Sequence, residues 1–320
     1  MALQKKLLTI VVSVGMVGTA QAELSVNGQK TQGDSLAVAR SIMSGNSTSY
    51  GTDYNSYNSF NPNTYNQLAI STGSRGVMVV DVKTGQALYE KNADIARPIA
   101  SITKLMTAMV VLDAGLDMNE EIKLVPSDFV GPKKASSRLK SGDRLNRAEM
   151  LLMTLMKSEN PAAKSLARTY PGGYNAFMKA MNRKAESLGM YSAFFGDPTG
   201  LDKRNVASPS DLVKMVKAAG NYDLIRRFST TASYDFHVAN YASGNRHYAA
   251  RNTSYLVRDG LYPIGISKTG FINEAGKCVV METRINNRPA VVVLLGAGNS
   301  STRWKDAETI LNSLSSRRYI

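Results

Sequence analysis

A chain of 320 residues with a formal net charge of +14 at pH 7 is long enough to bury one large hydrophobic core with a smaller lobe attached. Its single cysteine excludes an internal disulfide, and its two histidines argue against a histidine-based triad or a zinc site. The basic excess favours a polyanionic partner; because no aromatic-plus-basic module occurs, we expect an anionic wall or envelope polymer and not nucleic acid.

Residues 1–22 have the pattern of a secretory signal peptide. Lys5 and Lys6 form a basic start, a mostly apolar run follows over 7–16, and Ala20-Gln21-Ala22 fits a cleavage site. The apolar run is short and interrupted by glycine, which argues against a stable membrane anchor. We therefore expect an exported protein that is cleaved after Ala22.

Residues 23–72 are rich in Ser, Asn, Thr, Gly and Tyr and show no sustained hydrophobic periodicity. Such a composition cannot bury enough apolar surface to order itself. We predict a disordered linker over 23–72 and one folded domain over 73–320.

The domain opens with a predicted hairpin of strands at 76–82 and 87–91. A loop then leads to a helix that begins at Ser101 and is stopped by Gly115. The apolar residues of this helix recur at helical spacing and predict that it is largely buried. They are Ile102, Leu105, Met106, Met109, Val110 and Leu112.

A hydroxyl and an ammonium stand in the first turn of this apolar helix. Ser101 and Lys104 are three residues apart, so they share one face and their head groups can meet. Burial lowers the pKa of a lysine, and a neutral lysine can take a proton from a neighbouring serine. The pair therefore has the chemistry of a nucleophile beside its base. A lone Ser-x-x-Lys more often combines a capping serine with a surface lysine, so the rest of the chain must decide.

The middle of the domain is predicted to be helical. Residues 116–145 are irregular or strand-like, and Asn146 with Glu149 forms a capping box that opens an apolar helix ending near 157. Further helices are predicted over 161–170, 174–188 and 208–220. The chain then becomes β-rich, with strands predicted at 230–238, 264–268, 278–285 and 290–295 and a final helix at 302–314. This order indicates one sheet assembled from both ends of the domain.

A second polar motif, Ser158-Glu159-Asn160, lies between two predicted helices. In a functional interpretation the Ser158 hydroxyl relays a proton to a leaving group and the Asn160 amide orients the substrate. In a structural interpretation Asn160 is an N-cap before Pro161 and Ser158 only ends the preceding helix. We expect Glu159 to point away from the site and outward.

A third motif, Lys268-Thr269-Gly270, ends a predicted strand. Lys268 would supply fixed positive charge for a substrate carboxylate and Thr269 a hydroxyl, while Gly270 would let a peptide lie along the strand edge. A second Lys-Thr-Gly at 83–85 falls in a predicted hairpin turn, and a second Ser-x-x-Lys at 137–140 falls in a polar stretch. We interpret both copies as structural.

The three motifs follow one another in the order found in penicillin-binding proteins and class A β-lactamases. On these residues, and on the segments 167–179 and 197–201, the chain resembles the serine D-alanyl-D-alanine peptidases over roughly residues 74–315. Within that family it is most similar to the low-molecular-mass D,D-endopeptidases of the 7/8 type. Many carboxypeptidases of the family continue into a second β-domain and an amphipathic anchor. Because this chain stops at Ile320, we expect neither, which favours the endopeptidase branch.

The resemblance implies a β-lactamase-like α+β fold, in which an antiparallel sheet flanked by helices meets a mostly helical subdomain at the active site. It implies that Lys104 accepts the proton of Ser101, that Ser101 attacks a D-alanine carbonyl, and that water hydrolyses the acyl-enzyme. The oxyanion would be held by the N–H of Ser101 and by one near Phe271. Ser158 would be a third catalytic residue, and Asn160, Lys268, Thr269 and Gly270 would bind substrate.

The same resemblance implies neither a metal nor an organic cofactor. The implied partners are the cross-linked stem peptides of peptidoglycan and, as covalent inhibitors, β-lactam antibiotics, in the periplasm. One alternative is a class A β-lactamase, but the Glu-x-x-Leu-Asn pattern of those enzymes is absent between Ser158 and Lys268. The other is a non-catalytic peptidoglycan-binding protein that keeps the fold, against which the intact motif set argues.

Overall fold

The computed structural model describes residues 25–26, 29–30 and 67–316. The chain divides into two units, 1–60 and 61–320, and each is described by itself. In the first unit β1 (Ser25–Val26) and β2 (Gln29–Lys30) pair antiparallel. The predicted signal peptide lies outside the described residues, as does most of the predicted linker.

The last residues of the predicted linker pack on the folded domain. Leu68 is buried in a hydrophobic cluster of the domain. Thr72 is hydrogen-bonded through Oγ1 to the Tyr89 hydroxyl at 3.0 Å, and its carbonyl accepts from Lys91 Nζ at 2.9 Å. The domain therefore includes residues before 73, because the apolar Leu68 and two hydrogen bonds hold this segment.

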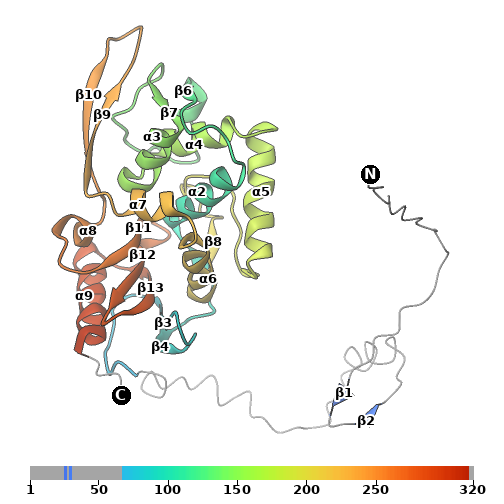
Figure 1. Ribbon diagram of the computed structural model, residues 1–320, viewed down its shortest axis with the longest axis vertical. Coiled ribbons are helices and arrows are strands. Elements are labelled where there is room, and N and C mark those ends of the chain that lie inside the picture. Colours follow the sequence, from blue (N-terminus) through green and yellow to red (C-terminus); the bar gives the residue numbers. More distant parts are fainter. Residues whose placement is uncertain (1–24, 27–28, 31–66, 317–320) are drawn as a thin grey trace, which may run out of the picture. The chain divides into compact units, whose positions relative to one another are not determined.

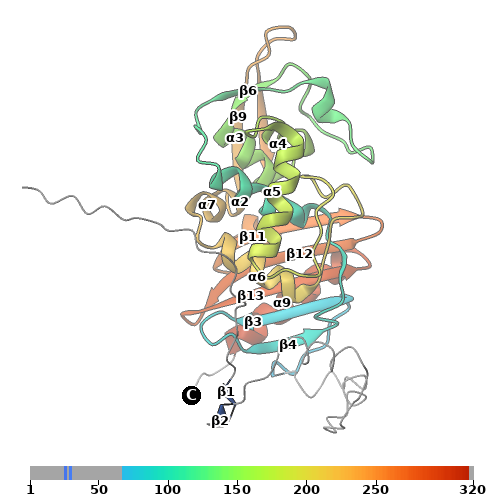
Figure 2. The same cartoon turned by 90° about the vertical axis from the view of Figure 1, so that its right-hand side faces the viewer.

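A five-stranded antiparallel sheet takes its strands from both ends of the domain (Figures 1 and 2). Its order is β11-β12-β13-β3-β4, which confirms the predicted assembly. Early strand β3 pairs with late strand β13, with Val79 opposite Val292. The strand bounds are Gly76–Asp81 for β3, Ala87–Lys91 for β4, Ile264–Ile272 for β11, Gly276–Ile285 for β12 and Arg288–Ala297 for β13.

The predicted helices lie close to their expected positions, whereas the short helices Asp223–Ser229 and Tyr255–Asp259 were not predicted. The chain also differs from the prediction at the expected nucleophile. Ser101 belongs to a 3-10 turn, η1, and Lys104 opens the α-helix that follows, α2. The capping box is confirmed, since Asn146 and Glu149 each accept a backbone N–H of the other. The bounds are η1 Ala100–Thr103, α2 Lys104–Asp113, η2 Pro126–Phe129, α3 Arg147–Leu152, the π-helix η3 Met153–Lys157, α4 Asn160–Arg168, α5 Gly173–Ser187, α6 Pro209–Ala219, α7 Asp223–Ser229, α8 Tyr255–Asp259 and α9 Ser300–Ser316.

Both faces of the sheet are covered by helices. Successive residues of a strand point to opposite faces, and along β12 and β13 they join two separate clusters. Val280 and Val293 join the cluster that contains α2 and α6. Val279 and Leu294 join the cluster that contains α9. Because both faces are buried, the two strands have nearly continuous apolar sequences.

Within residues 67–316, three short strand pairs lie outside this sheet. They are β5 (Arg97–Pro98) with β8 (Val206–Ala207), β6 (Glu121–Lys123) with β7 (Arg144–Asn146), and β9 (Ser233–Val238) with β10 (Arg246–Arg251). The strand predicted at 230–238 therefore does not join the main sheet. It pairs with β10 in a hairpin that projects beyond the helical part of the domain (Figures 1 and 2). In residues 67–316 no helix is long and apolar enough to cross a membrane.

Candidate active site

The head groups of Ser101 and Lys104 meet, as their spacing predicts. Lys104 Nζ donates to Ser101 Oγ at 2.9 Å, to Asn160 Oδ1 at 2.7 Å and to the Thr199 carbonyl at 2.7 Å. Its side chain is fully buried. Burial lowers the pKa of Lys104 to about 7, while the negative charges of Asp197 and Glu159 oppose this shift. Near neutral pH a large fraction of Lys104 is therefore uncharged and able to accept the Ser101 proton.

The second motif lies in the turn between η3 and α4. Ser158 adopts a left-handed conformation (φ 64°) at the end of η3, and its Oγ accepts from Lys268 Nζ at 2.9 Å. The N-cap of α4 is Glu159, so the interpretation of Asn160 as the cap is wrong. Instead, the Asn160 amide oxygen accepts from Lys104. The turn thus presents one side chain to each of the two lysines.

The third motif lies on β11, at the edge of the main sheet. Lys268 is buried, and its Nζ also donates to the Thr269 carbonyl at 2.9 Å. Burial lowers the pKa of Lys268 well below its ordinary value, and the nearby charges of Lys104 and Arg303 add to that shift. The fixed positive charge that we expected on Lys268 therefore needs an anionic partner, such as a substrate carboxylate.

Gly270 is required by the protein's own backbone. A Cβ at this position would lie 2.9 Å from the Ile99 carbonyl oxygen and 3.0 Å from the Ser101 nitrogen. Its lack of a side chain thus lets β11 approach the segment that carries Ser101, a different reason from the peptide access that we expected. The neighbouring Thr269 hydroxyl is hydrogen-bonded to the hydroxyl of Thr253 at 2.7 Å.

The turn at 197–200 completes the surroundings of Lys104, and no site residue was predicted in it. Gly200 has φ +85°, and a Cβ there would lie 2.0 Å from the Ala100 carbonyl oxygen. The turn therefore rests directly on the residue before Ser101. Buried Asp197 accepts from the Gly200 N–H at 2.8 Å and from Asn205 Nδ2 at 2.9 Å, which holds the Thr199 carbonyl toward Lys104.

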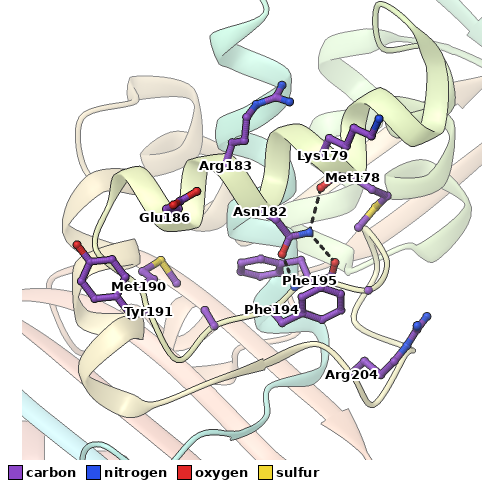
Figure 3. A pocket seen from close by; sticks show the side chains of 12 residues that line it. Met178, Lys179, Asn182, Arg183, Glu186, Met190, Tyr191, Phe194, Phe195 and Arg204 are labelled. Atoms are coloured by element: carbon purple, nitrogen blue, oxygen red, sulfur yellow. Dashed lines mark hydrogen bonds between the residues drawn. The ribbon is translucent and has the colours of Figure 1, made fainter. Parts of the chain in front are cut away.

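A groove of about 710 Å³ lies beside this turn, between α5 and residues 190–196 (Figure 3). None of the predicted site residues lines it. Asn182 of α5 crosses its floor, donating to the Phe195 carbonyl and accepting from the Phe195 N–H, both at 2.9 Å (Figure 3). These bonds fix the segment that leads into the 197–200 turn.

The two duplicate motifs have other roles. In the β3–β4 turn Asp81 accepts from the N–H groups of Lys83 and Thr84 at 2.9 and 3.1 Å, which is a structural arrangement, as expected. Ser137 is hydrogen-bonded not to Lys140 but to Glu159, at 2.6 Å. Our prediction that Glu159 points outward is wrong: the residue is only 5% exposed, because Ser137 and Tyr248 supply hydrogen-bond donors inside the protein.

Within residues 67–316 no group of three or more His, Cys, Asp or Glu side chains is arranged to hold a metal ion. Cys278 is buried in β12, as predicted, and burial raises the pKa of its thiol to about 11. A low-pKa reactive thiol is therefore not part of this site.

Comparison with known proteins gives the same family from sequence and from structure. A family model described as D-alanyl-D-alanine carboxypeptidase, a serine peptidase family, matches residues 61–299. The chain is 44% identical over 247 residues to the D-alanyl-D-alanine endopeptidase of Escherichia coli, covering 77% of this chain and 78% of that protein. It is 44% identical to the enzyme of the same name from Pseudomonas aeruginosa, covering 75% and 76%.

Solved structures of known proteins indicate the same family as the sequence comparisons. The Streptomyces K15 DD-transpeptidase superposes with a TM-score of 0.72 at 25% identity, covering 77% of this chain and 98% of that one. Penicillin-binding protein D2 from Listeria monocytogenes, in its cefotaxime-bound form, superposes with a TM-score of 0.67 at 26% identity and the same coverage. The expected α+β fold, with an antiparallel sheet and a helical subdomain, is therefore confirmed.

Proposed function

The chain belongs to the D-alanyl-D-alanine carboxypeptidase family of serine peptidases, and from this premise we propose how its site performs the reaction. The protein is a serine D,D-peptidase, which cleaves the bond after a D-alanine through an acyl-enzyme. The observation that carries our assignment of the nucleophile is the 2.9 Å contact between Ser101 Oγ and the fully buried Nζ of Lys104.

In the acylation step, neutral Lys104 takes the proton of Ser101, and Ser101 Oγ attacks the D-alanine carbonyl carbon. The Thr199 carbonyl and the Asn160 amide oxygen accept hydrogen bonds from Lys104 and orient its lone pair toward Ser101. The backbone of β11 at Gly270 passes beside the Ser101 nitrogen, which supports an oxyanion hole formed by the N–H of Ser101 and one near Phe271.

The leaving amine must receive a proton. Ser158 accepts a hydrogen bond from Lys268, so its own hydroxyl hydrogen is free to point toward the leaving nitrogen. As Ser158 gives this proton to the amine, it takes up the proton that Lys104 received from Ser101, so Lys104 returns to its neutral form and Ser158 stays a hydroxyl. Lys268 and the Thr269 hydroxyl would then bind the carboxylate of the substrate, which also returns positive charge to Lys268. Water hydrolyses the acyl-enzyme and restores Ser101.

The substrate that we propose is the cross-linked stem peptide of peptidoglycan. The support is 44% identity to two proteins named D-alanyl-D-alanine endopeptidase. Carboxypeptidase activity on uncross-linked stems is a second candidate, favoured by the family's description. We further propose that β-lactams acylate Ser101, since a relative has been solved in a cefotaxime-bound form. The predicted signal peptide would place the protein in the periplasm.

A fluorescent penicillin and a purified cross-linked muropeptide dimer test these assignments. The wild-type protein is expected to hold the label and cleave the dimer, whereas a β-lactamase would release the label quickly and a binding-only protein would never acquire it. Ser101→Ala is expected to abolish labelling while circular dichroism stays unchanged. Mass spectrometry that located the acyl group on Ser137 would contradict the assignment.

A further inference from the structure

Glu159 is a buried acid placed between the two residues of the second motif that contact lysines. Ser158 reaches Lys268 and Asn160 reaches Lys104, while the buried Glu159 carboxylate is hydrogen-bonded to Ser137 and Tyr248. We propose that Glu159 is a positioning residue of the active site, which holds the 158–160 turn in place and supplies negative charge behind Lys104. This inference rests on the proposed function, because it assigns Lys104 the role of base.

The contacts of Glu159 join the site to two elements that are distant in sequence. Its Oε2 accepts from Ser137 Oγ at 2.6 Å, and its Oε1 accepts from the Tyr248 hydroxyl at 2.5 Å. Tyr248 belongs to β10 of the projecting hairpin. Arg138 lies over the Tyr248 ring at 4.4 Å and donates to the Ala249 carbonyl at 3.2 Å, so the 137–138 segment and β10 also hold each other.

Burying this acid has a cost that hydrogen bonds from neutral groups do not fully offset. Within residues 67–316 no lysine or arginine forms an ion pair with Glu159, and its two described partners are hydroxyls. A buried charge without a direct counter-ion is destabilising in most proteins. Glutamine could make hydrogen bonds of similar geometry without that cost. The negative charge of Glu159, and not only its hydrogen bonds, therefore needs a functional explanation.

That role follows from the groups that face Lys104. The 197–200 turn places the Thr199 carbonyl and the negative charge of Asp197 near the Lys104 amine. The 158–160 turn contributes the Asn160 amide and the negative charge of Glu159. The positive charge of Lys268 on β11 also acts on this amine. Asp197 and Glu159 stabilise the protonated amine, whereas burial destabilises it. Removal of the Glu159 charge should make Lys104 easier to deprotonate, because an opposite charge has been lost.

The test is the pH dependence of acylation by a fluorescent penicillin. Glu159→Gln keeps the shape and removes the charge, so the acidic limb of the rate profile should move to lower pH. The matched control is Glu308→Gln on α9, which makes the same chemical change remote from the site and should leave the profile unchanged. An unshifted profile for a folded Glu159→Gln protein would overturn the charge role.

A second pair of variants tests the positioning role and covers the case in which Glu159→Gln does not fold. Tyr248→Phe and Ser137→Ala each keep the charge and remove one hydrogen bond. Their plateau rates should fall about tenfold when the changes are combined, with the midpoint of the profile less affected. A double variant that acylates at the wild-type rate would overturn the inference. If Ser101→Ala still became labelled, the proposed function would fail instead, so the two failures are distinguishable.

Discussion

Replacement of Gly200 by alanine should disable the site from outside it. Gly200 has φ +85°, a conformation that costs a non-glycine residue about 1–2 kcal/mol. In addition, the new Cβ would lie 2.0 Å from the Ala100 carbonyl oxygen, whereas contacts under 3.0 Å essentially never occur for real Cβ atoms. The 197–200 turn and the segment before Ser101 must therefore separate by about 1 Å. Overpacking of this kind adds about 1–3 kcal/mol to the cost.

The same displacement should reach the chemistry, because the turn carries the Thr199 carbonyl that accepts from Lys104. A misplacement of about 1 Å in a catalytic arrangement can lower the rate about 100-fold. Gly85 provides the matched control, since it has φ +72° but no atom lies within 4 Å of the position that a Cβ would occupy. Gly85→Ala should therefore show only the conformational cost.

Two measurements separate these effects: denaturant unfolding and the rate of acylation by a fluorescent penicillin. Gly85→Ala should lose about 1 kcal/mol of unfolding free energy and acylate normally. Gly200→Ala should lose about 3 kcal/mol and acylate about 100-fold more slowly. A Gly200→Ala protein that acylates at the wild-type rate would refute the argument that this turn positions Lys104 and Ser101.

Three further outcomes are expected. Lys268→Ala should slow acylation by several orders of magnitude, because it removes a charge-assisted substrate contact. Lys83→Ala should leave the acylation rate unchanged and alter stability by only about 0.5 kcal/mol. If labelling kinetics showed Lys83→Ala to be the slow variant, the site would be misplaced. Since the pKa of Lys104 is lowered to about 7 and only the neutral amine can act as base, the acylation rate should rise with pH and have its midpoint near 7; a flat profile between pH 6 and 8 would contradict it. A chain that starts at residue 61 should melt like the full-length protein, but one that starts at residue 73 should lose about 2 kcal/mol through the removal of Leu68, as thermal or denaturant unfolding can measure.

Helix spacing, capping and turn preferences predict contacts between residues that are close in sequence. Helical spacing places Lys104 over Ser101, since residues three apart share a face, and the structure has these groups 2.9 Å apart. The Asn146 capping box and the β12–β13 turn at Asn286 and Asn287, both with positive φ, are local in the same way. Each depends on a few neighbouring residues, so pattern alone is sufficient.

Contacts between distant segments required the tertiary structure. The partner of β9 was not predictable, because β10 has a short, largely polar sequence that resembles a loop. Glu159 was expected to face solvent, because its hydrogen-bond partners, the hydroxyls of Ser137 and Tyr248, are distant in sequence and cannot be predicted from the neighbouring residues. The reason for Gly270 was also hidden, since the backbone that it must approach belongs to residues 99–101.

The sequence by itself determined the residue types, their order, and the pairing of Ser101 with Lys104, because these depend on local geometry and on the family's motifs. Only the tertiary structure decided that Lys104 also meets Asn160 and Thr199 and that Lys268 meets Ser158. Those contacts join segments up to 110 residues apart. They arise from packing of the whole domain, and it is that packing which excludes water and lowers the pKa of Lys104.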